Sequence, residues 1–157
     1  MSMVRMYLYG IGQKVVIPTI KVNDDGMLIE TAPVKVFDLS DLAGWKEHVY
    51  NMMQKRAQQA PPSDGESTPG SAVLDKLKVE RWSDFEKHAV MYTLHKGAGY
   101  ITFYATGKNE DGMWTTGTVE RKFHNKAPLE VILDEVAAEL IKQPEAVPKP
   151  TTLLLGG

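Results

Sequence analysis

The stretch Ala89–Phe123 reads AVMYTLHKGAGYITFYATGKNEDGMWTTGTVERKF, and its alternation decides the fold class. Apolar or aromatic residues recur at every second position on both sides of the Gly-Ala-Gly turn at 97–99, which is the period of a half-buried strand. A second turn, Asn109–Gly112, leads into a third run, Met113–Phe123. We therefore predict three antiparallel strands joined as a meander.

A final helix follows the meander. Pro128 fits the first turn of this helix, because the backbone donor that proline lacks would have no partner there. Seven apolar residues then recur at helical spacing and form one stripe: Leu129, Ile132, Leu133, Val136, Ala137, Leu140 and Ile141. Further prolines after Lys142 forbid a regular helix, so we expect residues 144–157 to form a proline-rich tail.

Before position 60 the chain shows the same strand period. Met3–Tyr9 alternates, and Lys14–Val22 is rich in β-branched residues, which predicts two strands. Pro18 indicates an edge position or a bulge in the second strand, and we expect the edge. Met27–Thr31 and Val34–Phe37 are predicted as short strands divided by a proline.

Helical spacing takes over after these strands. It predicts a helix over Leu39–Gln58, capped by Asp38 or Ser40. Residues 59–70, QAPPSDGESTPG, hold three prolines and almost nothing apolar, so we expect a solvated loop there. A capping-box pattern at 83–86 predicts the start of a short helix.

Runs of strands followed by single long helices, rather than strict alternation, predict an α+β fold with helices packed on one face of an antiparallel sheet. The length of 157 residues is that of one ordinary domain. We therefore expect a single domain over residues 1–157, with a loop at 59–70 and the tail at 144–157.

The composition excludes several classes of protein. The chain has no cysteine, which excludes a disulfide framework and every thiolate metal site and is typical of a reducing compartment. Its formal net charge of -2 creates no overall field that would attract nucleic acid. Glycines interrupt the apolar start before a signal-peptide core could form, and no apolar run has the length of a membrane span. We expect a cytoplasmic protein that does not bind a membrane.

No motif for catalysis, for a metal or for a cofactor stands out. The four histidines lack the spacing of a helical metal pair, although His95 and His124 could meet across the sheet. No serine lies in a nucleophile elbow, and the glycine pairs at 10–12 and 97–99 lack the remaining residues of nucleotide-binding loops. We predict no catalytic, cofactor or metal site, while a catalytic site that assembles only in space stays open.

The outer side of the final helix is acidic. Glu130, Asp134, Glu135 and Glu139 oppose the apolar stripe, and neighbours among them are spaced as like-charged pairs, which cost about 0.2–0.5 kcal/mol each. This pattern is typical of a solvated face, and it also fits an acidic patch for a basic partner.

Aromatic residues interleave with basic ones over the second half. Tyr100, Tyr104 and Trp114 are the candidates for stacking on RNA or single-stranded nucleic acid. The same residue types are also what an antiparallel sheet prefers for packing. We favour the structural interpretation and regard nucleic acid as the less favoured partner.

Two resemblances bear on function. The last residues, Leu153–Gly157, resemble the diglycine tail of ubiquitin-like proteins, but those domains are about half as long and order their elements differently, so we favour coincidence or a short extra strand at Thr151–Leu155. In size, mild acidity and α+β composition, the chain resembles the small cytosolic immunity proteins of bacteria, including those of contact-dependent growth inhibition. That resemblance implies stoichiometric binding that neutralises a basic toxin domain, with acidic side chains in place of phosphates. The expected function is therefore a non-catalytic protein-binding module, with nucleic-acid binding and an enzyme as alternatives.

Overall fold

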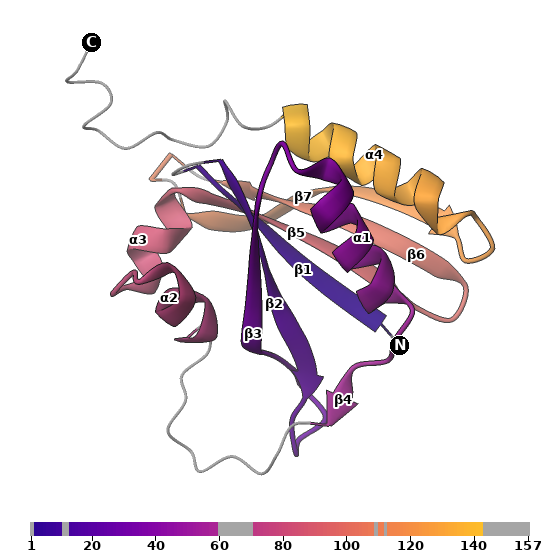
Figure 1. The fold of residues 1–157 in the computed structure, drawn as a ribbon, viewed down its shortest axis with the longest axis horizontal. Coiled ribbons are helices and arrows are strands. Elements are labelled where there is room, and N and C mark those ends of the chain that lie inside the picture. Colours follow the sequence, from indigo (N-terminus) through magenta and orange to yellow (C-terminus); the bar gives the residue numbers. More distant parts are fainter. Residues whose placement is uncertain (1, 11–12, 60–70, 109, 112, 143–157) are drawn as a thin grey trace.

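The structure is a computed structural model that describes residues 2–10, 13–59, 71–108, 110–111 and 113–142. These residues form seven strands and four helices around one sheet (Figure 1). The first half of the chain contributes β1 (Ser2–Tyr9), β2 (Lys14–Val22), β3 (Leu28–Asp38), α1 (Leu42–Met53) and β4 (Gln58–Gln59). The second half contributes α2 (Ser71–Leu77), α3 (Trp82–Lys87), β5 (Ala89–Lys96), β6 (Tyr100–Lys108), β7 (Trp114–His124) and α4 (Leu129–Lys142).

The sheet consists of two three-stranded meanders, β1-β2-β3 and β5-β6-β7, which meet where the first strand of each, β1 and β5, pair with one another. The strand order is β3-β2-β1-β5-β6-β7, and the short β4 pairs in parallel with the end of β2. The central strands β1 and β5 run antiparallel, so that Tyr9 lies opposite Ala89 and Ser2 lies opposite Lys96. All the other pairs along this path are antiparallel too. The predicted α+β class with an antiparallel sheet is confirmed, as is the meander predicted over residues 89–123.

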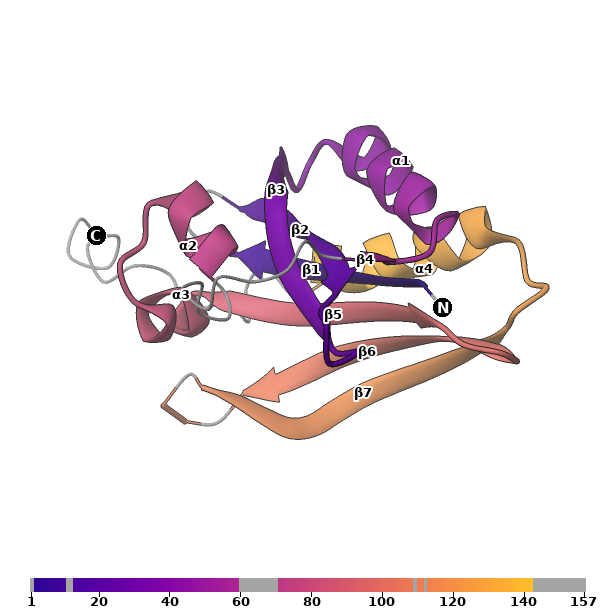
Figure 2. The same ribbon diagram turned by 90° about the horizontal axis from the view of Figure 1, so that it is seen from below.

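The two long helices, α1 and α4, cover one face of the sheet (Figures 1 and 2). In each helix, buried residues recur every four positions: Trp45, Val49 and Met53 in α1, and Ile132, Val136 and Leu140 in α4. They pack on alternate residues of the two central strands: Val4, Met6 and Leu8 of β1, and Val90, Tyr92 and Leu94 of β5. The helical and strand periods thus direct one set of side chains from each element into a single layer, which is the main hydrophobic core.

The short helices α2 and α3 lie on the opposite face, at one end of the sheet (Figure 2). There Tyr7, on the side of β1 away from α1, packs against the rings of Trp82, Phe85 and Trp114 at centroid distances of 6.0, 5.1 and 5.6 Å. The prediction that helices pack on one face therefore holds for the two long helices alone. Strand β1 has large apolar or aromatic side chains on both sides at this end, so both sides are covered.

The prolines of the first meander interrupt pairing without ending a strand. We expected Lys14–Val22 at the sheet edge, but β2 is an inner strand between β1 and β3. The register of the β2–β3 ladder shifts between Ile17 and Thr19, which is the bulge alternative for Pro18. Pro33, after a cis peptide bond, lies in the same interruption, so one strand, β3, replaces the two short strands predicted.

Helix α1 is shorter than the predicted Leu39–Gln58. It begins after Asp41, whose carboxylate accepts a hydrogen bond from the Gly44 amide at 3.1 Å. Asp41 is therefore the N-cap, rather than either residue predicted for that role. The helix ends at Met53, and Gln58–Gln59 then pair with β2, which removes position 59 from the predicted loop.

Helix α3 also begins earlier than predicted. Its N-cap is Arg81, so Ser83 lies inside the helix and does not cap it. Residues 60–70 of the predicted loop and the whole predicted tail, 144–157, lie outside the described residues. The two meanders, each followed by a long helix, share one sheet and one main core.

Candidate functional site

Helices α1 and α4 lie side by side and run in opposite directions (Figure 1). Leu42, at the start of α1, and Ile141, near the end of α4, line one groove. Tyr50 and Glu130, from the other ends of the same helices, line a second groove. Both helices bury their inner stripes in the main core, and residues of both helices line each of the two grooves.

The second of these grooves is the candidate binding site, and we call it the α1–α4 groove. It has a volume of about 440 Å³ and six lining residues: Lys46, Glu47 and Tyr50 from α1, and Glu130, Leu133 and Asp134 from α4. Leu133 is buried and forms its floor, Tyr50 is half-buried against the main core, and the two glutamates are exposed. The groove therefore combines an apolar floor with a charged rim.

The rim of the α1–α4 groove is acidic. Lys46 and Asp134 form an ion pair between the two helices, whereas no described residue forms an ion pair with Glu47 or Glu130. The groove lining has three carboxylates and one lysine, so it carries a net negative charge. Carboxylates gathered on one surface raise the local concentration of cationic groups.

The structure divides the four predicted acidic residues. Glu130 and Asp134 line the α1–α4 groove, and Glu135 is exposed. Glu139 is only 8% exposed, and Arg121 of β7 donates a hydrogen bond to it at 3.4 Å. Because four residues make about one helical turn, positions 130 and 134 flank the buried stripe on one side and position 139 flanks it on the other. Glu139 is therefore a structural residue and not part of an acidic face.

The three predicted aromatic residues are divided as well. Tyr100 is 56% exposed, and Tyr104 is half-buried on the face of the sheet away from α4. Trp114 instead stacks on Tyr7, and its indole nitrogen donates to the Ala89 carbonyl at 3.0 Å. Trp114 is thus packed with Tyr7, Trp82 and Phe85 on the face of the sheet opposite α1 and α4, and only the two tyrosines remain as candidates for stacking.

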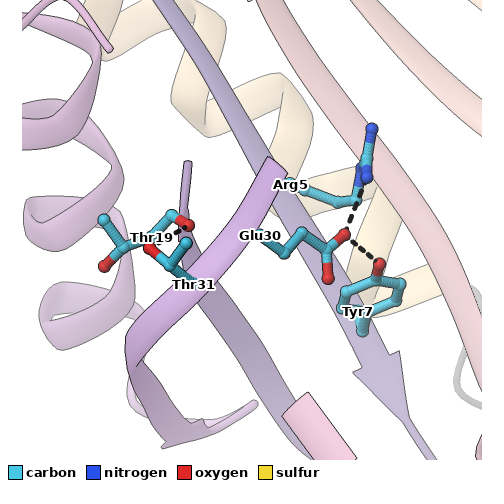
Figure 3. Close-up of polar contacts among 5 residues, drawn as sticks. All are labelled: Arg5, Tyr7, Thr19, Glu30 and Thr31. Carbon is cyan, nitrogen blue, oxygen red and sulfur yellow. Dashed lines mark hydrogen bonds and ion pairs between the residues drawn. The ribbon is translucent and has the colours of Figure 1, made fainter. Parts of the chain in front are cut away.

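One polar cluster was not predicted, because its residues are far apart in the sequence. Figure 3 shows Glu30 of β3 directed toward Arg5 and Tyr7 of β1. The Glu30 carboxylate accepts a hydrogen bond from Arg5 Nη1 at 2.7 Å and another from the Tyr7 hydroxyl. The contact passes strand β2, which pairs with β1 only over 14–16 and diverges from it beyond that point (Figure 1). Glu30 therefore ties the edge strand β3 to β1, one of the two central strands of the sheet.

The pKa values of Arg5 and Tyr7 are both raised in this cluster. Burial alone lowers the pKa of Arg5, but the hydrogen bond and the negative charge of Glu30 outweigh burial and raise it. Burial, and then the neighbouring carboxylate, raise the pKa of Tyr7. Both groups therefore stay protonated at neutral pH, whereas a general acid or base needs a pKa near the working pH. The arrangement is that of a structural tie.

The predicted histidine pair does not form a site. His95 and His124 do not meet, because they belong to β5 and β7 and β6 lies between them. Within the described parts of the chain, no group of three His, Asp or Glu side chains could hold a metal ion, and no helix is long and apolar enough to cross a membrane. A comparison of the chain with known protein families and with curated proteins found no match. The geometry of the α1–α4 groove is therefore the basis for a functional proposal.

Proposed function

We propose that the protein is a non-catalytic protein-binding module that binds a basic partner through the α1–α4 groove and its rim. One observation carries the proposal: Glu47 and Glu130 are both exposed and lack an ion-pair partner among the described residues, above an apolar floor at Leu133. Such a groove suits a partner surface on which basic side chains surround an apolar contact. Rim charges of this kind mainly accelerate association and exclude partners of the wrong charge.

The finer role that we propose is stoichiometric neutralisation of a basic toxin domain in the cytoplasm. It is supported by the resemblance of the chain, in size, charge and α+β fold, to bacterial immunity proteins. In such a complex the groove carboxylates take the place of nucleic-acid phosphates on the basic surface of the toxin.

Binding of single-stranded nucleic acid is a second candidate, because Tyr100 and Tyr104 lie on a sheet face that α1 and α4 do not cover. It has less support, since the packing of Trp114 removes one of the three stacking residues. An enzymatic function has less support still, because the raised pKa values of Arg5 and Tyr7 keep both groups protonated at neutral pH.

The experiment compares two variants that carry the same change of charge in different places. One has Glu47→Lys with Glu130→Lys in the groove, and the control has Asp24→Lys with Asp25→Lys in the exposed β2–β3 turn. Proteins captured from a lysate of the source cells by the wild type are purified, and their association with each variant is measured by surface plasmon resonance over a salt series. We expect the groove variant to associate about tenfold more slowly at low salt, with a flatter salt dependence, and the control to keep the wild-type rate.

Equal rates for the two variants would show that the groove is not the interface. Salt-dependent binding of a fluorescent oligouridylate, lost in Tyr100→Ala and Tyr104→Ala, would favour the nucleic-acid candidate instead.

A further inference from the structure

Each wall of the α1–α4 groove has one carboxylate that forms no ion pair with a described residue, and one aromatic ring lies beside them. Glu47 lies on α1 and Glu130 lies on α4, and Tyr50 follows Glu47 by about one helical turn. We propose that this groove receives an arginine side chain of the partner, with the guanidinium between the two carboxylates and its plane against the Tyr50 ring. This inference rests on the proposed function, because it names the chemistry of the partner at the same site.

A cationic side chain already lies in the groove. The Lys46 ammonium pairs with Asp134, and this pair satisfies one of the three groove carboxylates. The two side chains are 29% and 66% exposed, and an ion pair so exposed adds little to stability. The pair neutralises Asp134, while Glu47 and Glu130 form no ion pair with a described residue and can pair with a cation of the partner.

Arginine fits this arrangement better than lysine. A guanidinium is planar, carries five donors, bonds to carboxylates in parallel pairs and stacks on aromatic rings, whereas an ammonium is a compact and strongly hydrated charge. Leu133 and the half-buried Tyr50 both line the groove, so the aliphatic part of an arginine side chain has apolar groups against which to lie. A volume of about 440 Å³ leaves room for one long side chain and its flanking backbone.

The experiment uses three capped amino acids as probes: N-acetyl-arginine methylamide, its lysine counterpart and its uncharged citrulline counterpart. Each is titrated into the full-length ¹⁵N-labelled protein, and binding is followed by chemical-shift changes. We expect the arginine probe to shift amides of Lys46–Tyr50 and Glu130–Asp134, to bind about two- to fivefold more tightly than the lysine probe, and to bind far more tightly than citrulline.

Variants assign the effect to the groove. Glu47→Gln and Glu130→Gln should each weaken the arginine probe, whereas Glu135→Gln removes an exposed carboxylate of α4 outside the groove and should not. Tyr50→Leu should abolish the preference for arginine over lysine, and Tyr50→Phe, which keeps the ring, should retain it. Because Tyr50 is half-buried, thermal melting of both Tyr50 variants checks that they are folded.

The outcomes separate this inference from the proposed function. Equal binding of the arginine and lysine probes, sensitive to Glu47→Gln but not to Tyr50→Leu, would overturn the preference for arginine and leave an acidic protein-binding groove in place. The same holds if no probe shifts the groove amides although Glu47→Lys with Glu130→Lys still slows the partner. If no probe binds and charge reversal leaves partner association unchanged, both proposals fail.

Discussion

The carboxylate of Glu30 holds two groups of β1 that backbone pairing alone would leave without partners. The Glu30 side chain is 7% exposed and the Arg5 side chain 28%. We expect Glu30→Ala to lower the free energy of unfolding by about 3 kcal/mol, because it leaves a largely buried guanidinium without its counter-charge. Urea unfolding measures the loss. Asp38→Ala is the matched control: its ion pair with Lys14 also joins two strands but is exposed, so it should cost less than about 1 kcal/mol, and equal costs would contradict the structural tie.

The His48 imidazole makes stability depend on pH. Burial, and then the positive charge of Lys35, lower the pKa of His48 below its ordinary value of 6.5. The unfolded chain then binds a proton at a pH where the folded protein still keeps the ring neutral, so stability is lost as the pH falls below 6.5 and is unaffected above it. We expect the free energy of unfolding in urea to fall as the pH is lowered below 6.5, and His48→Gln to reduce that fall. An unchanged fall in the variant would assign it to other groups.

Single residues are the scale at which sequence predicts least. Tyr100 and Tyr104 share a strand, so their common face follows from the strand period. The environment of Trp114 depends on how β7 pairs with β6, and that ladder shifts between Thr106 and Lys108. The role of Glu30 could not be predicted from the sequence, because Arg5 and Tyr7 of β1 come near it only where β1 and β2 diverge. Neither the shift in the β6–β7 ladder nor the divergence of β1 and β2 can be predicted from a local sequence pattern.

At the scale of an element, the buried and the exposed apolar residues of α4 should contribute very differently to stability. Leu133 is 2% exposed and Val131 is 54% exposed on the same helix. We expect Leu133→Ala to lower the free energy of unfolding by about 2–5 kcal/mol, because it leaves a cavity in the main core. Val131→Ala should change it by less than about 0.5 kcal/mol. Thermal and urea unfolding of both variants check this, and similar losses would mean that the buried stripe does not anchor the helix.

The ends of a helix could be predicted where residues next to it in the sequence determine them. The apolar stripe of α4 and the prolines that follow it predicted that helix almost to the residue. The predicted end of α1 was wrong, because the chain after Met53 leaves the helix and Gln58–Gln59 pair with β2, a contact between distant segments. Its start was wrong by a smaller margin, since several polar residues in a row could each cap it and only the structure selects Asp41.

At the scale of the whole molecule, the class of the fold could be predicted, but the arrangement of its strands could not. Alternation in Ala89–Phe123 predicted an antiparallel meander, and strands grouped apart from helices predicted an α+β fold. Nothing local states that β1 pairs with β5, and that pairing brings α1 beside α4. The α1–α4 groove could therefore not be predicted from the sequence, although two of its residues, Glu130 and Asp134, were among the predicted partner-binding residues.

The two halves of the chain meet where β1 pairs with β5, and we expect this pairing to hold them together without the peptide link between Gln59 and Ser71. No described strand or helix is interrupted if the chain is divided between Gln59 and Ser71, and each fragment then keeps one meander and one long helix. We expect the two fragments, expressed separately and mixed, to reassemble into a native-like heterodimer whose melting temperature rises with concentration. Met6→Asp, in the central strand, should prevent reassembly, while Asp25→Asn in the exposed turn should not. Fragments that fail to combine at any concentration would mean that the β1–β5 pairing needs the covalent link between the halves. Reassembly would instead make the two fragments a split reporter, whose fold forms only when two molecules that carry them come together.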